Sequence, residues 1–303
     1  MTVTIDNRLL RKLERFRIFP RGLYRGGQAG MRRSLSRGTG LEFADHKAYS
    51  VGDDIRYLDW MLYGRLEELF VKVFEQEESL PVYILLDCSA SMSLGEPTKA
   101  EFAKRIAAAI CYVGLANQDH VRVSLFGNGL ISSSRTLSGK AQIYEMLDFL
   151  GSAPSSGTPG TIGARGKETT DVTRAIEGFL SEHPLSGSAF ILSDFLDPKG
   201  VMEGVRLLAS RRFGIYGMHV VAPEEAAPEL SGDVELFDVE TARVRKVPLK
   251  RDTVVRYREF LADYWSTLRA ELQRYGVWYL QLFSDRPVEE TLFTVFPKEG
   301  VFE

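Results

Sequence analysis

VYILLDCSAS, at residues 82–91, places an apolar strand pattern directly before the motif Asp-x-Ser-x-Ser. A strand buried within a sheet cannot hold a carboxylate and two hydroxyls along its length, so we expect Asp87, Ser89 and Ser91 to lie where the strand ends. In an open parallel sheet, ligands bind at the carboxyl ends of the strands. This stretch therefore predicts an oxygen-lined site at one edge of a parallel sheet.

From residue 81 onward, strand patterns alternate with helix patterns. The runs ILL, FIL and YLQLF are almost wholly apolar, which is typical of strands buried on both faces of a sheet. The strand patterns cover 82–87, 121–126, 189–193, 214–221 and 277–283, and the helix patterns cover 99–117, 141–150, 170–183, 201–212, 253–275 and 288–296. This order predicts an α/β fold built on a doubly wound, mostly parallel sheet.

Three segments lie outside this alternation. Residues 1–40 predict a basic amphipathic helix followed by a Gly- and Arg-rich linker, and residues 41–80 predict a β extension of short strands. Residues 234–247 predict a β-hairpin inserted into the α/β domain, which we place at 81–300. Because the core sheet of such a domain is generic, we expect the β extension and the hairpin to determine specificity.

Composition and charge narrow the class of protein. The chain is 44% hydrophobic and 26% charged, as is usual for soluble globular proteins. Its two cysteines, Cys88 and Cys111, do not form a disulfide framework, and we find neither a secretory signal pattern nor a membrane-span pattern, so we expect a cytoplasmic protein. Residues 1–40 hold a net charge of +8 in a chain of net charge −3. This asymmetry indicates either a solvated helix face or a basic arm that docks on an acidic surface or on nucleic acid.

Oxygen-bearing side chains follow or precede several predicted elements at the same edge of the sheet. Asp87, Ser89 and Ser91 end one strand, Asp194 follows another, and Thr170 begins a helix. Such hard oxygen ligands suit Mg²⁺, with Ca²⁺ and Mn²⁺ as alternatives. Because the motif offers only two carboxylates, the bound cation keeps positive charge and an open position that a carboxylate from another molecule can fill. We therefore expect an exposed metal site that binds a partner.

These five residues resemble the metal-ion-dependent adhesion site of von Willebrand factor A domains. The matching segments are DCSAS, TTDVTRAI and LSDF, and the adjacent Thr169 and Thr170 are alternative ligands. The resemblance implies that the two serines and the threonine contact the metal directly. It also implies that the two aspartates act through water.

A wider stretch resembles a bacterial family of uncharacterised proteins related to these domains and associated with MoxR-type AAA+ ATPases. The resemblance covers about residues 30–295, and its most specific segments are GLEFADHKAYSVGDDIRYLDW (40–60) and LPVYILLDCSASM (80–92). It implies a non-enzymatic adaptor or co-chaperone that uses a metal to grip an acidic side chain of a protein partner, with a MoxR-type ATPase as the expected partner.

Two other functions remain open. An aspartate at a strand end followed by small residues also indicates an Mg²⁺-dependent phosphohydrolase with Asp87 as its nucleophile. However, Ser89 stands where such enzymes usually have a second carboxylate for proton transfer. The basic N-terminal arm indicates nucleic-acid binding, although no aromatic stacking platform accompanies its arginines.

Overall fold

The computed structural model describes residues 6–20, 33–34, 42–77, 79–154, 171–182, 185–228, 232–237, 244–249 and 251–303. The chain divides into two compact units, one formed by Met1–Arg25 with Pro81–Glu303 and the other by Gly26–Leu80. The first unit is mixed α/β, and the second contains a small sheet with a short helix.

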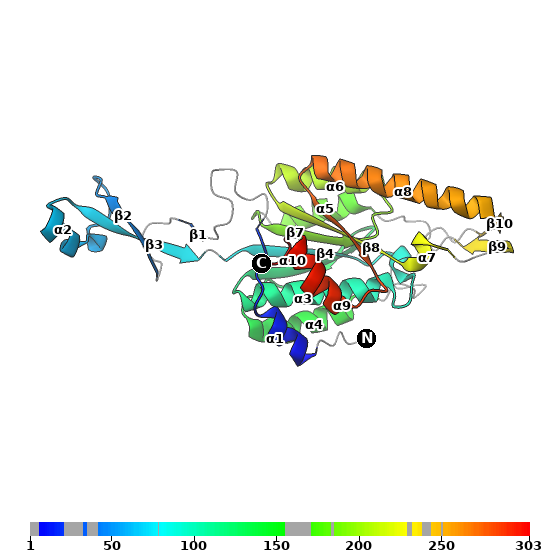
Figure 1. The fold of residues 1–303 in the computed structure, drawn as a ribbon, viewed down its shortest axis with the longest axis horizontal. Coiled ribbons are helices and arrows are strands. Elements are labelled where there is room, and N and C mark those ends of the chain that lie inside the picture. The colour runs from blue at the N-terminus through cyan, green and yellow to red at the C-terminus, as the bar shows by residue number, and fades with distance from the viewer. Residues whose placement is uncertain are drawn as a thin grey trace. The chain divides into compact units, whose positions relative to one another are not determined.

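Six strands form the sheet of the α/β unit (Figure 1). The parallel strands are β4 (Pro81–Asp87), β5 (His120–Gly127), β7 (Ser188–Ser193), β8 (Gly214–Val221) and β11 (Trp278–Phe283), and β6 (Gly129–Ser133) runs antiparallel to β5. The strand order is β11-β8-β7-β4-β5-β6. After β4, the chain adds β5 and β6 on one side of this strand. It then adds β7, β8 and β11 on the other side. This mostly parallel arrangement is compatible with the predicted doubly wound fold, and its switch point lies at β4.

Helices cover both faces of this sheet (Figure 1). One face holds α3 (Lys99–Ala116) and α4 (Ile143–Ser152), and the other holds α5 (Val172–Glu182), α6 (Pro198–Ser210) and α8 (Arg251–Arg274). Shorter elements are α7 (Pro223–Ala226), α9 (Val288–Glu290), a π-helical turn at Thr291–Val295 and α10 (Phe296–Lys298). After α7, the strands β9 (Gly232–Phe237) and β10 (Val244–Leu249) pair as an antiparallel hairpin.

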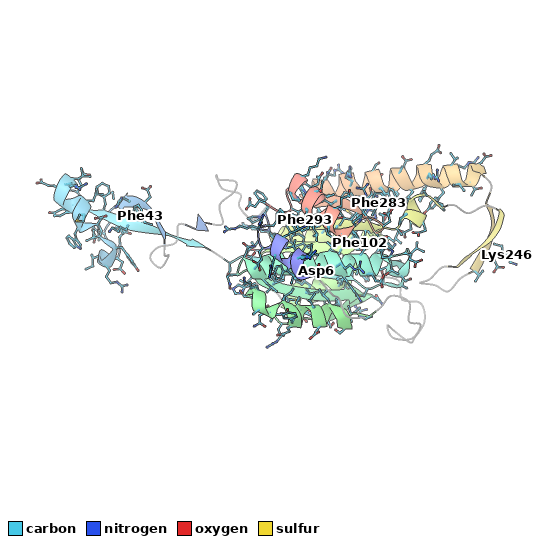
Figure 2. The ribbon with its side chains drawn as sticks, turned by 60° about the horizontal axis from the view of Figure 1, so that its bottom comes forward. Asp6, Phe43, Phe102, Lys246, Phe283 and Phe293 are labelled. Carbon is cyan, nitrogen blue, oxygen red and sulfur yellow. The ribbon has the colours of Figure 1, made fainter. Side chains whose placement is uncertain are left out.

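Apolar side chains fix the position of the sheet between its helices. On the α5 face, the ring of Phe179 is fully buried and makes edge-on contacts with Tyr83 at 5.1 Å and Phe213 at 5.8 Å between centroids. On the opposite face, α3 buries Phe102, which is labelled in Figure 2. Because both faces of β4 are packed in this way, the polar end of the strand is held in one place.

The basic N-terminal helix α1 (Asn7–Leu13) packs on α3 through apolar side chains. Leu13 and Ile18 are fully buried, and the hydroxyl of Tyr112 on α3 donates to Glu14 Oε1 at 2.7 Å. The arginines at positions 8, 11 and 15 remain exposed. The apolar side of this helix is therefore occupied by its own unit.

The unit Gly26–Leu80 contains a helix that the sequence patterns do not predict. Its sheet has the order β1-β3-β2, with β1 (Arg33–Ser34), β2 (Glu42–Ala48) and β3 (Phe70–Glu77). The sequence predicts only short strands over 41–80, whereas Trp60–Leu66 forms helix α2. Asp59 explains this correction, because its side chain accepts hydrogen bonds from the backbone N–H groups of Met61 and Leu62 at 3.0 and 3.1 Å and so caps the helix.

Removal of the Phe179 ring tests the packing of the α5 face. We expect Phe179→Ala to lower the free energy of unfolding by about 3–5 kcal/mol, because the cavity left among Tyr83 and Phe213 cannot close fully. Urea unfolding measures this change. The control is Tyr144→Ala on α4, whose side chain is 67% exposed and whose loss should change stability by less than about 0.5 kcal/mol. Equal losses in the two variants would contradict the assigned core.

Candidate metal centre

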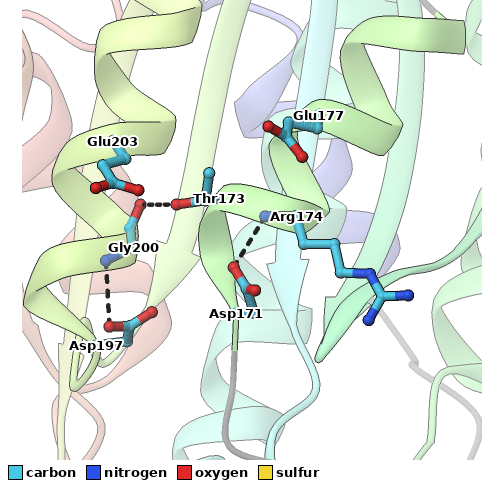
Figure 3. Close-up of a pocket in the computed structure, with 7 residues that line it drawn as sticks. All are labelled: Asp171, Thr173, Arg174, Glu177, Asp197, Gly200 and Glu203. Atoms are coloured by element: carbon cyan, nitrogen blue, oxygen red, sulfur yellow. Dashed lines mark hydrogen bonds between the residues drawn. The ribbon is translucent and has the colours of Figure 1, made fainter.

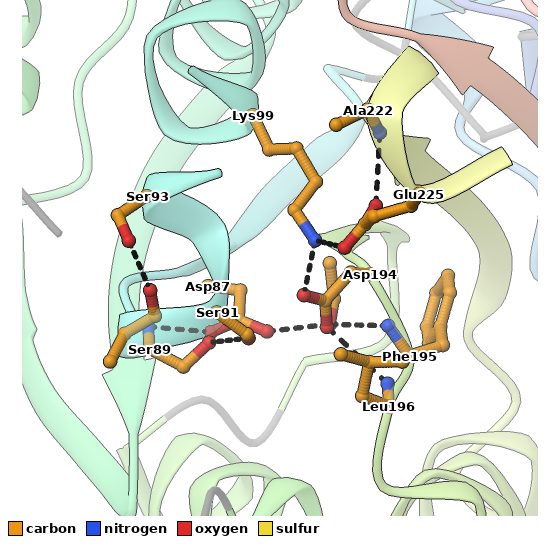
Figure 4. Close-up of polar contacts among 12 residues, drawn as sticks. Asp87, Ser89, Ser91, Ser93, Lys99, Asp194, Phe195, Leu196, Ala222 and Glu225 are labelled. Atoms are coloured by element: carbon orange, nitrogen blue, oxygen red, sulfur yellow. Dashed lines mark hydrogen bonds and ion pairs between the residues drawn. The ribbon is translucent and has the colours of Figure 1, made fainter. Parts of the chain in front are cut away.

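The carboxyl ends of β4 and β7 bring four of the predicted ligands together (Figure 4). Asp87 is the last residue of β4, Asp194 directly follows β7, and Ser91 lies in the 3₁₀ turn Ala90–Ser93. The hydroxyl oxygens of Ser89 and Ser91 are 3.0 Å apart. The fifth predicted ligand, Thr170, and its alternative, Thr169, lie outside the described residues.

Strand register explains how Asp87 is held. Leu86 of β4 is in register with Leu192 of β7, so Asp87 lies beside Ser193. The Ser193 hydroxyl donates to Asp87 Oδ2 at 2.6 Å, and the backbone N–H of Ser89 donates to Asp87 Oδ1 at 2.8 Å. Ser193 is not among the predicted site residues, although its hydroxyl at the end of the FILS run was a usable signal.

The environment of Asp87 disfavours its negative charge. Burial, and then the neighbouring carboxylate of Asp194, raise the pKa of Asp87 to about 7, although hydrogen bonds from Ser193 and Ser89 oppose the change. In the part of the chain that the structure describes, the hydrogen-bond partners of this carboxyl group are neutral. A cation placed near both carboxylates would remove the penalty.

Asp194 has a charged partner that the sequence patterns did not reveal. The fully buried Lys99 donates from Nζ to Asp194 Oδ2 at 2.8 Å and to Glu225 Oε1 at 2.5 Å. Burial opposes the charge of this ammonium, but the carboxylates of Asp194 and Glu225 outweigh burial, so the pKa of Lys99 is raised. Its position in the helix pattern was the available signal, because a lysine on the same face as Phe102 and Ile106 requires a counterion.

The candidate ligands lie deeper than expected. Asp87, Ser89, Ser91 and Asp194 are 2%, 8%, 9% and 4% exposed, so the expectation of an exposed site is wrong for these side chains. Leu94 and Leu196 follow the two polar segments and are 45% and 56% exposed. The candidate centre is thus a buried polar cluster, formed by Asp87, Ser89, Ser91 and Asp194 and called the recess below, next to exposed apolar side chains.

The donor set of this recess fits a hard divalent cation. Two carboxylates and two hydroxyls converge there, and Mg²⁺ and Ca²⁺ prefer such oxygen ligands. Across the described residues, no group of three or more His, Cys, Asp or Glu side chains is arranged to hold a metal. A site at this recess would depend on serine hydroxyls in addition to two aspartates, and metal binding here stays a prediction.

A polar hollow lies between α5 and α6 (Figure 3). The aspartates at the starts of these helices hold their first turns, because Asp171 accepts from the Arg174 N–H at 2.9 Å and Asp197 from the Gly200 N–H at 3.2 Å. We therefore attribute these carboxylates to helix capping. The pocket measures about 540 Å³ and is lined by Asp171, Thr173, Arg174, Glu177, Asp197, Gly200 and Glu203.

Fold and recess together define a mixed α/β protein with a polar site at the switch point of a mostly parallel sheet. The chain belongs to the family described as "Protein of unknown function DUF58", whose model matches residues 45–264. Within the described segments, we find no helix with the length and apolarity needed to span a membrane.

This chain is also similar to several known proteins and solved structures. The uncharacterized proteins Rv1480 of Mycobacterium tuberculosis and Mb1516 of Mycobacterium bovis are each 27% identical over 227 residues, which cover 73% of this chain and 69% of theirs. Among solved structures, the conserved hypothetical protein BatB from Bacteroides thetaiotaomicron matches with a TM-score of 0.46 at 16% identity, over 73% of this chain and 97% of that one. An aerotolerance-related membrane protein from Bacteroides fragilis matches with a TM-score of 0.42 at 15% identity, over 73% and 98% of the two chains.

The raised pKa of Asp87 makes the stability of the metal-free chain depend on pH. Its carboxyl group has a pKa of about 7 in the folded chain and 3.8 as its ordinary value, so the folded state holds an additional proton between these two pH values. We therefore expect the free energy of unfolding in the presence of chelator to fall as pH rises from about 4 to about 7, and this contribution to level off above that range. Urea unfolding at pH 5, 6, 7 and 8 measures the slope. Asp87→Asn cannot titrate and should lose this part of the slope, so identical slopes in both proteins would contradict the assignment.

Proposed function

We propose that this chain is a divalent-cation-dependent protein-binding module that holds Mg²⁺, or Ca²⁺ or Mn²⁺, in the recess at the ends of β4 and β7. The observation that supports it most directly is the convergence of Asp87 and Asp194 with the hydroxyls of Ser89 and Ser91 in a buried position. A divalent cation stabilises two adjacent buried carboxylates that otherwise disfavour each other's charge.

The residues of the recess have distinct roles in this proposal. Following the resemblance to von Willebrand factor A domains, Ser89, Ser91 and Thr170 offer hydroxyl oxygens to the cation, and the two aspartates act through water. Hydrogen bonds from Ser193 and from the Ser89 backbone orient the Asp87 carboxylate. When bound, the cation supplies an electrophilic position that a carboxylate of another protein can occupy.

The proposed partner is a protein that presents Asp or Glu, with a MoxR-type AAA+ ATPase as the candidate because of the resemblance carried by residues 40–60 and 80–92. In this role the chain is an adaptor or co-chaperone. The unit Gly26–Leu80 supports a contribution to partner binding, because exposed apolar side chains concentrate on α2 and the turn before it. These are Ile55, Trp60, Met61, Tyr63 and Leu66, with exposed fractions of 64%, 65%, 75%, 43% and 55%.

The phosphohydrolase alternative gains no support from the geometry. A nucleophilic carboxylate needs one oxygen free to attack substrate. Both oxygens of Asp87 accept hydrogen bonds, and the residue is almost completely buried. Turnover of a generic aryl phosphate that is lost in Asp87→Asn would reverse this preference.

Removal of the two hydroxyls tests the metal site. We expect the double variant Ser89→Ala, Ser91→Ala to bind Mg²⁺ at least about tenfold more weakly than the unaltered chain, because two neutral oxygen ligands are lost. Titration calorimetry on chelator-treated protein measures the affinity. The matched control is Ser93→Ala in the same turn, whose hydroxyl donates to the Ala90 carbonyl at 2.6 Å and should be dispensable for the metal. An unaltered chain that binds none of Mg²⁺, Ca²⁺ or Mn²⁺ would refute the proposal.

Substitutions on α2 test the partner surface independently of the metal. We expect Trp60→Ala with Met61→Ala to weaken binding to a purified MoxR-type ATPase by about tenfold, since exposed aromatic and Met side chains are frequent interface anchors. Mg²⁺ affinity should stay unchanged. Tyr144→Ala, an exposed aromatic on α4, is the control and should bind the ATPase normally. Binding by the unaltered chain that is equal in Mg²⁺ and in chelator would contradict metal-dependent recognition.

A further inference from the structure

Lys99 connects three segments that meet at the candidate metal centre (Figure 4). It is the first residue of α3, where the preceding Thr98 accepts a hydrogen bond from the Glu101 N–H at 3.2 Å and caps the helix. Its ammonium contacts Asp194, which follows β7, and Glu225, which lies on α7 after β8. The start of α3 therefore fixes the backbone of Lys99, and two carboxylates fix its ammonium.

The ammonium of Lys99 also offsets part of the negative charge beside the strand ends. Asp194 is held at both oxygens, because Oδ2 accepts from Lys99 and Oδ1 accepts from the Leu196 N–H at 3.3 Å. Glu225 is held likewise, since its second oxygen accepts from the Ala222 N–H at 3.0 Å. Part of the Asp194 charge is thus already neutralised by the chain itself, whereas Asp87 receives only neutral donors in the described structure.

We propose that Lys99 is a positioning residue that orients Asp194 and partly neutralises it, so that the recess binds a divalent cation weakly until an acidic partner supplies the missing negative charge. This inference rests on the proposed function and specifies its partner chemistry. The built-in ammonium lowers the attraction of the recess for a free cation and favours a ternary assembly in which the partner's carboxylate completes the charge. Metal and partner then bind cooperatively.

A purely structural lysine and a charge-setting lysine give opposite results when Lys99 is replaced. If the ammonium only maintains the fold, its loss weakens metal binding because the ligands lose their positions. If it sets the charge of the recess, its loss leaves Asp194 and Glu225 uncompensated, which destabilises the metal-free chain and strengthens cation binding. Stability and metal affinity then change in opposite directions.

The test compares variants of the full chain by Mg²⁺ calorimetry and by thermal unfolding with and without Mg²⁺ at pH 8. We expect Lys99→Met to bind Mg²⁺ about tenfold more tightly than the unaltered chain. We also expect this variant to have a lower melting temperature without metal. Added Mg²⁺ should raise its melting temperature more than that of the unaltered chain, because a ligand that binds more tightly stabilises the folded state more. Lys99→Arg keeps the cation and should bind Mg²⁺ with an affinity close to the original. Lys140→Met removes a lysine whose side chain is 64% exposed and controls for net charge.

Glu225→Gln provides a milder variant that decides the question if Lys99→Met does not fold. This variant removes one of the two carboxylates that share the Lys99 ammonium, so the ammonium neutralises Asp194 more fully. We therefore expect the affinity for Mg²⁺ to fall about threefold. Unchanged or weaker Mg²⁺ binding by folded Lys99→Met, or unchanged binding by Glu225→Gln, overturns the inference and leaves the proposed function intact. If the unaltered chain binds none of Mg²⁺, Ca²⁺ and Mn²⁺, both the inference and the proposed function fail.

Discussion

The repulsion between two buried carboxylates at the ends of adjacent strands is the constraint on which the candidate centre depends. Asp87 and Asp194 are both removed from water, where each charge would otherwise be solvated. The chain compensates them unequally, because Asp194 receives the ammonium of Lys99 and Asp87 receives a hydroxyl and a backbone N–H. Burial and then the Asp194 carboxylate raise the pKa of Asp87, and its neutral hydrogen-bond donors offset only part of this rise. In the proposed function, a bound divalent cation would supply the charge that offsets both carboxylates.

The order of the strands creates this juxtaposition. β7 joins the sheet on the side of β4 opposite to β5, so the chain reverses its direction of growth at β4. The parallel strands β4 and β7 are neighbours in register, and their polar ends therefore lie side by side. The position of these polar ends was predictable from the sequence, because apolar runs that end in Asp87 and in Asp194 indicate buried parallel strands with polar ends. Periodicity and strand-end chemistry together identified four of the residues that meet here.

The sequence patterns failed where tertiary contacts decide a residue's role. The position of Lys99 on the apolar face of its helix pattern indicates a buried ammonium, but the sequence does not identify its counterion, because Glu225 lies 126 residues further along the chain. The sequence predicts Ser193 as the end of an apolar strand, and only the structure shows that its hydroxyl donates to Asp87. Helix α2 was missed because its aromatic residues favour strands, whereas the local cap at Asp59 overrides that preference.

In the proposed function, the burial of the candidate ligands limits what can reach a cation bound there. Ser89 and Ser91 are less than a tenth exposed, so in the proposed function a partner would approach them with a projecting side chain rather than with a flat surface. A single carboxylate meets this requirement, and the exposed Leu94 and Leu196 would offer apolar contacts to the residues beside it. Apolar contacts that exclude water strengthen the attraction between a cation and a carboxylate, since the local dielectric constant falls. In the proposed function, partial neutralisation of Asp194 by Lys99 leaves the partner's carboxylate to supply the remaining negative charge, and apolar contacts beside that carboxylate would strengthen its attraction to the cation.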